Sequence, residues 1–208
     1  MMVKSFVHWR KNKMRFILSV LAVCVALSLE PLQSDETNAA AAEKIVTDDI
    51  SRFKIELPEP VSKEKEKESD ALYRKGLAIQ KQKKINQAIT LWESALKINP
   101  RNAACLNHYA WFVGVEDEGE FKDLEKGLKL GLKAAMATQW NNRDIIDTVG
   151  HIYYRMGRVE KAIAVEKLGL KKGLAGNSGT GFIRQKVKMF SRALEKKNTK
   201  SNPGEKSK

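Results

Sequence analysis

The chain has 208 residues, a hydrophobic fraction of 42% and a formal net charge of +13. This length suits one folded domain of ordinary size with unstructured ends, and it excludes two large domains joined by a linker. The charge lies at the two ends, because residues 1–15 carry +5 and residues 183–208 carry +7, which leaves about +1 for the rest. A nearly neutral middle matches a phosphate backbone poorly, so nucleic acid is not expected to bind the globular part.

The first 29 residues have the order of an export signal. A basic segment ending in KNKMR is followed by an uncharged apolar stretch, residues 16–29. As a helix this stretch would rise about 21 Å, which is short of a hydrocarbon core about 30 Å thick. A cleaved signal peptide is therefore favoured over a short membrane anchor formed by residues 16–29, and both stay open. In either case the remainder is expected in the periplasm or cell envelope, retained at the inner membrane if the anchor persists.

Residues 30–68 are predicted to be a polar linker. They include the run SDETNAAAAEK and most of the run KEKEKESD (residues 63–70), with Pro58 and Pro60 between the two runs. Such a composition buries too little apolar surface to fold by itself. A short extended piece is expected at FKIEL, residues 53–57, and the second charged run is either linker or the start of the first helix.

Large and small residues then recur at a common spacing. In residues 69–102 the pattern consists of Leu72, Gly76, Ile79, Ala88, Trp92, Ala95 and Pro100. Its first half recurs as Leu106, Tyr109, Ala110 and Val113, and again as Ile146, Val149, Gly150 and Tyr153. This pattern resembles the tetratricopeptide repeat (TPR), and the sequence around the second and third units resembles bacterial members of that family.

The resemblance implies an all-α, right-handed α-solenoid of three helical hairpins, residues 69–102, 103–142 and 143–178. Because each hairpin leaves an apolar face to be covered by the next, the last one needs a cap. Residues 179–197 fit that role, with apolar residues at helical spacing and Lys or Arg between them. Residues 198–208 are predicted to be a disordered basic tail.

Two departures from the repeat pattern stand out. The second unit is six residues longer than the first, and the excess is placed mainly at residues 114–120, between its two helices. Glu166 stands in the third unit where a large apolar residue is usual. In the second unit Gly127 and Gly131 replace larger residues, and each costs a helix about 1 kcal/mol relative to alanine, so that helix is expected to be the softest unless close packing compensates.

Motifs for catalysis or metal binding are not found. The three histidines lie outside any HExxH or cysteine cluster, so His108 and His151 are expected to line a groove or the surface, and no metal is expected. Cys105 is read as a small buried hydrophobe. The glycines of residues 173–181 lack a GxxxxGK[ST] motif. No enzyme activity, cofactor or small-molecule substrate is therefore expected.

In TPR proteins the first helices of the hairpins line a concave groove that binds a peptide or helix of a partner protein. The resemblance and the helical register together give ten candidate groove residues. They are Tyr73, Leu77, Gln80, Asn107, His108, Trp111, Asp147, His151, Tyr154 and Arg155. The expected function is a non-catalytic scaffold that binds another protein, of unspecified identity, in the cell envelope.

The alternative is an electrostatic binder of nucleic acid or anionic membrane acting through the basic C-terminal helix and tail. Steep salt dependence of binding separates the two readings, because counterion release dominates only the second. Some TPR proteins clamp a C-terminal carboxylate with Lys, Arg and Asn in the groove. Here Tyr73, Leu77, His108 and Asp147 occupy that region, so this specificity is not carried over.

Overall fold

Helices make up most of the part of the chain that the computed structural model describes, namely residues 44–45, 47–116, 119–171 and 180–201. All of them belong to the second of two compact units, residues 41–208. The predicted signal, residues 1–29, lies outside the described residues. Among the described residues, no helix combines the length and the apolar character that a membrane span requires.

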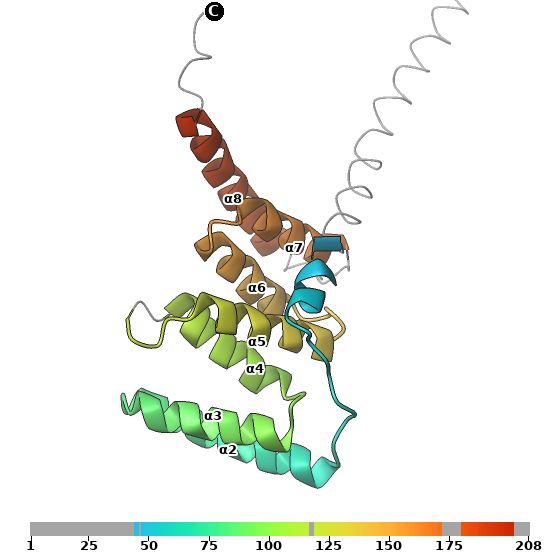
Figure 1. Cartoon of the computed structure of the whole chain (residues 1–208), viewed down its shortest axis with the longest axis vertical. Helices are drawn as coiled ribbons and strands as arrows, with labels where there is room; N and C mark the ends of the chain where they lie inside the picture. The colour runs from blue at the N-terminus through green and yellow to red at the C-terminus, as the bar shows by residue number, and fades with distance from the viewer. Residues whose placement is uncertain (1–43, 46, 117–118, 172–179, 202–208) are drawn as a thin grey trace, which may run out of the picture. The chain divides into compact units, whose positions relative to one another are not determined.

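The helices form successive hairpins (Figure 1). In chain order they are α2 (Lys63–Lys81), α3 (Ile85–Ile98), α4 (Ala103–Trp111), the π-helix η1 (Phe112–Glu116), α5 (Leu124–Ala137), α6 (Arg143–Arg155), α7 (Val159–Lys171) and α8 (Thr180–Ser201). Helix α2 packs on α3, α4 on α5, α6 on α7, and α8 on α7. The prediction of an all-α solenoid of helical hairpins with a C-terminal capping helix is confirmed.

Side-chain caps define where several of these helices begin. Asn102 accepts a hydrogen bond from the backbone N–H of Cys105 at 3.0 Å, and Asp123 accepts one from Lys126 at 2.9 Å. Asn142 does the same for the N–H of Asp144 at 3.0 Å. Each cap accepts hydrogen bonds from backbone N–H groups that the first helical turn leaves unpaired. The capping side chains therefore help to determine where α4, α5 and α6 start.

Close contacts within the hairpins occur at glycines. Trp92 on α3 is fully buried, and a Cβ atom on Gly76 of α2 would lie 2.4 Å from its Nε1. In the second unit a Cβ on Gly127 of α5 would lie 2.9 Å from the Cα of Gly114. Gly127 and Gly131 are both buried. The glycines of α5 therefore permit a close approach of helices, which offsets part of their cost in helix propensity.

The longer second unit is accommodated between α4 and α5. Helix α4 continues into η1, a π-helix, and the chain reaches α5 only at Leu124. The N–H of Asp123, just before α5, donates a hydrogen bond to the carbonyl of Val113 in η1 at 2.9 Å, which connects the two ends of this segment. A π-helix is a rare departure from α-helical geometry, and the predicted insertion at residues 114–120 begins in this one.

The prediction of a solvated linker over residues 30–68 is wrong for residues 47–55. Residues 47–52 are helical, and Asp49 and Ile55 are only 4% and 6% exposed. Ile55 joins the core formed by the second and third hairpins, with Ile50 and Phe53 packed beside it. These few apolar residues pack on the hairpins. The composition of the segment alone does not predict this packing, because it depends on a surface that other parts of the chain form. The expected extended piece at residues 53–57 is also wrong at its start, which is a turn with Lys54 at φ 49°.

We call residues 47–62 the strap, because it contacts the hairpins in reverse order. Asp49 bonds to Tyr153 and Lys161 of the third hairpin, and Arg52 pairs with Glu125 of the second at 2.7 Å. Farther along, the Pro58 carbonyl accepts a hydrogen bond from Arg101 at 3.0 Å. Helix α2 then begins at Lys63, so the second charged run is the start of the first helix.

Helix α8 covers the last hairpin. Ile183 and Phe190 are fully buried, while Val187 and Leu194 are partly buried. The helix continues to Ser201, so residues 198–201, predicted to be disordered, form its last turn instead. Residues 202–208 lie outside the described residues.

Candidate functional site

A groove with a volume of about 650 Å³ opens on the side formed by the first helices of the hairpins. Its lining comes from α2, α4, α6 and the residue before α6. The lining residues are Tyr73, Ala103, Ala104, Asn107, His108, Trp111, Asn142, Asp144, Ile145, Asp147 and Thr148. The groove thus combines two ring systems and an imidazole with amide and carboxylate groups.

Half of the candidate groove residues named from the sequence line this groove. They are Tyr73, Asn107, His108, Trp111 and Asp147. Trp111 is partly exposed, and its ring lies 5.6 Å from that of His151, edge to face. A rigid aromatic ring that keeps part of its surface exposed is a natural anchor for a partner side chain.

Two further candidates support the groove from behind. Leu77 packs in the apolar cluster around Trp92. Gln80 holds His108, with 2.9 Å between the Gln80 Oε1 and the His108 Nε2. Because a carbonyl oxygen only accepts, His108 donates from Nε2 and its Nδ1 is the acceptor nitrogen. Burial lowers the pKa of His108, so the ring is neutral at pH 7.

The three candidates near the end of α6 do not line the groove. His151 is half-buried between Trp111 and Phe190, whose rings each lie 5.6 Å away. Tyr154 stacks on Phe190 at 4.9 Å. Arg155 donates a hydrogen bond to the carbonyl of Val115 and so ties α6 to η1. The register prediction therefore does not hold here for groove lining, because α8 packs on His151 and Tyr154 and because Arg155 is bound to η1.

Tyr154 instead belongs to a second hollow, of about 830 Å³, that is formed mainly by α8. Its other lining residues are Gln185, Lys186, Lys188, Met189, Arg192, Ala193 and Lys196. Tyr154 and Met189 are 37% and 41% exposed, the large exposed hydrophobic side chains among the described residues. The lining of this hollow thus combines apolar side chains with four cationic ones.

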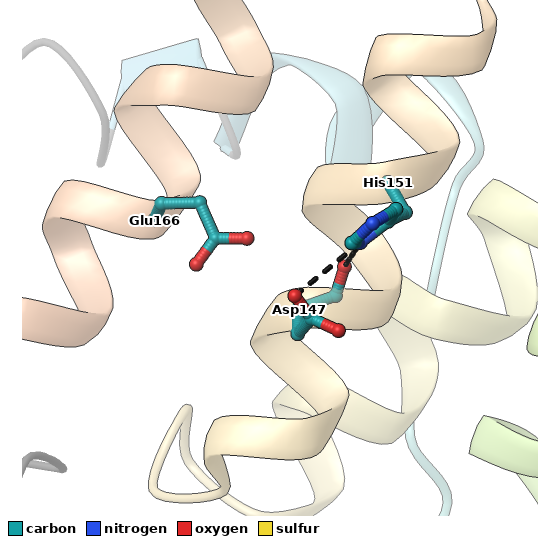
Figure 2. A group of neighbouring side chains, drawn as sticks. All are labelled: Asp147, His151 and Glu166. Carbon is teal, nitrogen blue, oxygen red and sulfur yellow. Dashed lines mark hydrogen bonds and ion pairs between the residues drawn. The ribbon is translucent and has the colours of Figure 1, made fainter. Parts of the chain in front are cut away.

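Asp147, His151 and Glu166 form a cluster between α6 and α7 (Figure 2). One ligand-type atom from each lies within 4.8 Å of the others. Glu166 is fully buried, and neither carboxylate oxygen has a hydrogen-bond partner among the described residues. Burial, together with the charge of Asp147, raises the pKa of Glu166 to about 8, while Lys186 acts in the opposite direction.

Cys105 behaves as predicted. It is fully buried, its thiol points to the Trp92 carbonyl at 3.6 Å, and burial raises its pKa to about 12. A thiol of this kind is a poor nucleophile, because the thiolate is the reactive form. Cys105 therefore serves packing.

Several lining residues were not predicted from the sequence. Ala103 and Ala104 precede Asn107 by one helical turn, and Asp144 precedes Asp147 by the same interval. Helical periodicity, extended one turn toward the N-terminus, is the signal that locates them. Asn142 has no such signal, because it is the capping residue before α6 and its exposure depends on the turn.

Comparison with known proteins shows the fold. Neither protein-family models nor curated proteins give a match to this sequence. Among solved structures, the TPR domain of Sgt2 from Aspergillus fumigatus is similar, with a TM-score of 0.53 and 23% sequence identity. The match covers 63% of this chain and 82% of that chain. At this level of identity the likeness concerns the TPR-like arrangement of helices.

Proposed function

We propose that this protein is a non-catalytic scaffold that binds a segment of another protein in the groove formed by α2, α4 and α6. The observation that carries the proposal is the groove itself, an open cavity of about 650 Å³ at which side chains from three hairpins converge. In a helical solenoid, the concave face is the surface that can bind an extended peptide or a helix.

The groove offers both anchoring and orientation. Trp111 provides apolar area on α4, and Tyr73 provides it on α2. Asn107 and Asp147 offer amide and carboxylate groups that would fix the direction of a bound backbone or of a donor side chain. A partner segment with a large apolar residue flanked by hydrogen-bond donors matches this arrangement.

We further propose that the protein is of the bacterial type and is exported to the cell envelope. The support is the basic segment followed by the apolar residues 16–29. Sequencing the N-terminus of the protein isolated from cell fractions tests this. A mature chain that begins after residue 29 in the periplasm supports a cleaved signal, an intact chain in the membrane fraction supports an anchor, and an intact chain in the cytoplasm contradicts export.

The groove is tested by cross-linking in cells followed by capture and mass spectrometry, with Trp111→Ala compared against Tyr154→Ala. Both variants remove a partly exposed aromatic ring, but only Trp111 lines the groove. We expect a captured partner to be lost in Trp111→Ala and retained in Tyr154→Ala, with circular dichroism showing both folded. Equal capture by both variants would contradict binding in the groove.

A second candidate function is supported by the hollow on α8. Lys188, Arg192 and Lys196 are exposed on one side of that helix, one turn apart, beside Met189 and Tyr154. Cations next to exposed apolar groups are typical of a helix that adsorbs to an anionic membrane surface. Nucleic acid would use the same cations without requiring the apolar side chains.

Vesicle binding separates this candidate from the groove. If α8 is the functional surface, binding to phosphatidylserine vesicles should fall steeply with salt and should weaken in both Arg192→Gln and Tyr154→Ala. Trp111→Ala should leave it unchanged. Absence of binding to anionic vesicles at low salt would remove the membrane function.

A further inference from the structure

Glu166 is a buried carboxyl group that the groove does not use. It lies on α7, is fully buried, and has no hydrogen-bond partner among the described residues. Its side chain points from α7 toward Asp147 and His151 on α6 (Figure 2). A buried carboxyl group without partners is costly, and it calls for a charged or donating group that completes it.

The neighbouring helix leaves space for Glu166. A Cβ atom on Gly150 would lie 2.6 Å from the Glu166 Oε1, so only glycine fits there without displacing the carboxyl group. Gly150 itself is buried on α6. The chain therefore combines an acid at a position that is usually apolar with a glycine that admits it.

His151 has its acceptor nitrogen at Nε2. Its Nδ1 lies 3.0 Å from the Asp147 carbonyl oxygen, which can only accept, so Nδ1 carries the hydrogen and Nε2 is the acceptor. Metal-bound histidines usually donate their second N–H to a backbone carbonyl or carboxylate in this way. The Asp147 Oδ1 lies 3.3 Å from the same Nδ1.

The ammonium group of Lys186 lies next to His151 and Asp147. The Lys186 Nζ, from α8, lies 3.1 Å from the His151 Nε2 and 3.6 Å from the Asp147 Oδ1. The Lys186 side chain is 21% exposed, so its flexible end can withdraw to solvent. The ammonium group of Lys186 therefore lies beside two of the three side chains in the cluster, and this flexible group can leave.

We propose that Asp147, His151 and Glu166 form a binding site for a divalent transition metal ion, with Zn²⁺ as the best match, and that Lys186 occupies this site when no metal is bound. One imidazole and two carboxylates are a ligand set that Zn²⁺ accepts, with water as the fourth ligand. Neighbouring ligands on tetrahedral zinc are about 3.3 Å apart, so atoms now within 4.8 Å need to approach by about 1.5 Å at most.

Isothermal titration of the purified full-length chain with ZnCl₂, after treatment with EDTA, tests the site. We expect one equivalent to bind, and Glu166→Gln and His151→Gln each to lower the affinity by about tenfold or more, which is the least that supporting residues of metal sites cost. Glu166→Gln keeps the shape of the buried side chain, so loss of binding there is not a loss of folding. Thermal unfolding of each variant verifies this.

A matched pair of lysine variants tests the role of the movable cation. Lys186→Met should bind Zn²⁺ more tightly than the native chain, because the ion no longer displaces an ammonium group. Lys188→Met, on an exposed neighbouring position of α8, should bind like the native chain. Titration without zinc binding, or zinc binding that survives Glu166→Gln unchanged, for example at His8 and Cys24 in the N-terminal segment, would overturn the proposal.

Discussion

Gly76 shows how much the first hairpin depends on one missing side chain. The indole of Trp92 fills the space that a Cβ would need, and the Ala88 carbonyl lies 3.3 Å from the same point. Trp92 is fully buried, and its ring packs at 5.0 Å against His108 and at 5.4 Å against Tyr109. The indole therefore cannot move away from Gly76 without disturbing the interface to the second hairpin.

We expect Gly76→Ala to lower the free energy of unfolding by about 1 to 3 kcal/mol, the usual cost of overpacking a filled core. Gly181→Ala is the matched control, since nothing lies within 4 Å of a Cβ at that position of α8. Urea unfolding followed by circular dichroism measures both. Equal effects of the two substitutions would show that the contact between Gly76 and Trp92 is unimportant.

In the turns inside the first and third hairpins, different residues adopt the same left-handed backbone conformation. Gly157, between α6 and α7, has φ 72°, and Lys83, between α2 and α3, has φ 60°. The left-handed region suits glycine and strains residues with a Cβ. One turn therefore has the favoured residue and the other does not.

A reciprocal pair of substitutions follows from this. Lys83→Gly should raise the free energy of unfolding by about 0.5 to 1 kcal/mol, and Gly157→Ala should lower it by about 1 kcal/mol. Thermal and urea unfolding of the two variants provide the measurement. A loss of stability in Lys83→Gly would mean that the greater freedom of glycine in the unfolded chain outweighs the relief of strain.

The strap is held to the third hairpin by Asp49. Its carboxylate accepts hydrogen bonds from the Tyr153 hydroxyl at 2.7 Å and the Lys161 ammonium at 2.8 Å. Burial alone would raise its pKa, but these bonds and the charges of Lys161 and Arg52 outweigh burial, so the pKa of Asp49 is lowered. The ionised form therefore stabilises the fold.

Removing that charge should loosen the strap. We expect Asp49→Asn to lower the free energy of unfolding by about 1.5 to 3 kcal/mol at pH 7, the range for hydrogen bonds to charged groups. Asp48→Asn, at an exposed position beside it, should have little effect. Urea titrations of the two variants make the comparison.

The pH dependence has a definite sign. Because the pKa of Asp49 is lower in the folded chain than in the unfolded chain, its contribution is present above about pH 4 and is lost as the pH falls through the folded value. The difference between the native chain and Asp49→Asn should therefore shrink toward zero below that range. A difference that is constant from pH 7 to pH 3 would exclude a role for the charge.

On the scale of the whole molecule, each hairpin packs on the next one along the chain, as expected for a solenoid. Helix α8 closes the series by burying Phe190 against the rings of His151 and Tyr154. Damage at this end should therefore spread first into α6 and α7. The buried cluster around Trp92, which joins the first hairpin to α4 and η1, does not include Phe190.

Phe190→Ala tests this directional coupling. It should cost about 3 to 5 kcal/mol, as is usual for a buried phenylalanine, and should speed hydrogen exchange in α6, α7 and α8 far more than in α2 and α3. Met189→Ala, at an exposed position next to it, should leave the exchange rates nearly unchanged. A uniform increase over all helices would instead indicate a single cooperative unit.

Much of the fold and part of the candidate site could be predicted. The hairpins follow from the recurrence of Leu72, Leu106 and Ile146 in register, and Trp111 and Asn107 follow from the helical face that this register exposes. Tyr154 and His151 were misplaced as groove residues, because helical register assigns a face to a residue and does not indicate which other helix covers that face. Helix α8 supplies that cover.

The sequence by itself determined the repeat, the close contacts at its small residues and the anomaly at Glu166, because these depend on spacing along one chain. Only the tertiary structure decided that Asp49 and Ile55 of the strap are buried, and that Glu166, His151, Asp147 and Lys186 meet. These contacts join α6 to α7 and α8, and the strap to the third hairpin, across long separations in the chain. Local periodicity carries no information about such pairings, since they arise only when the hairpins stack and bury their faces together.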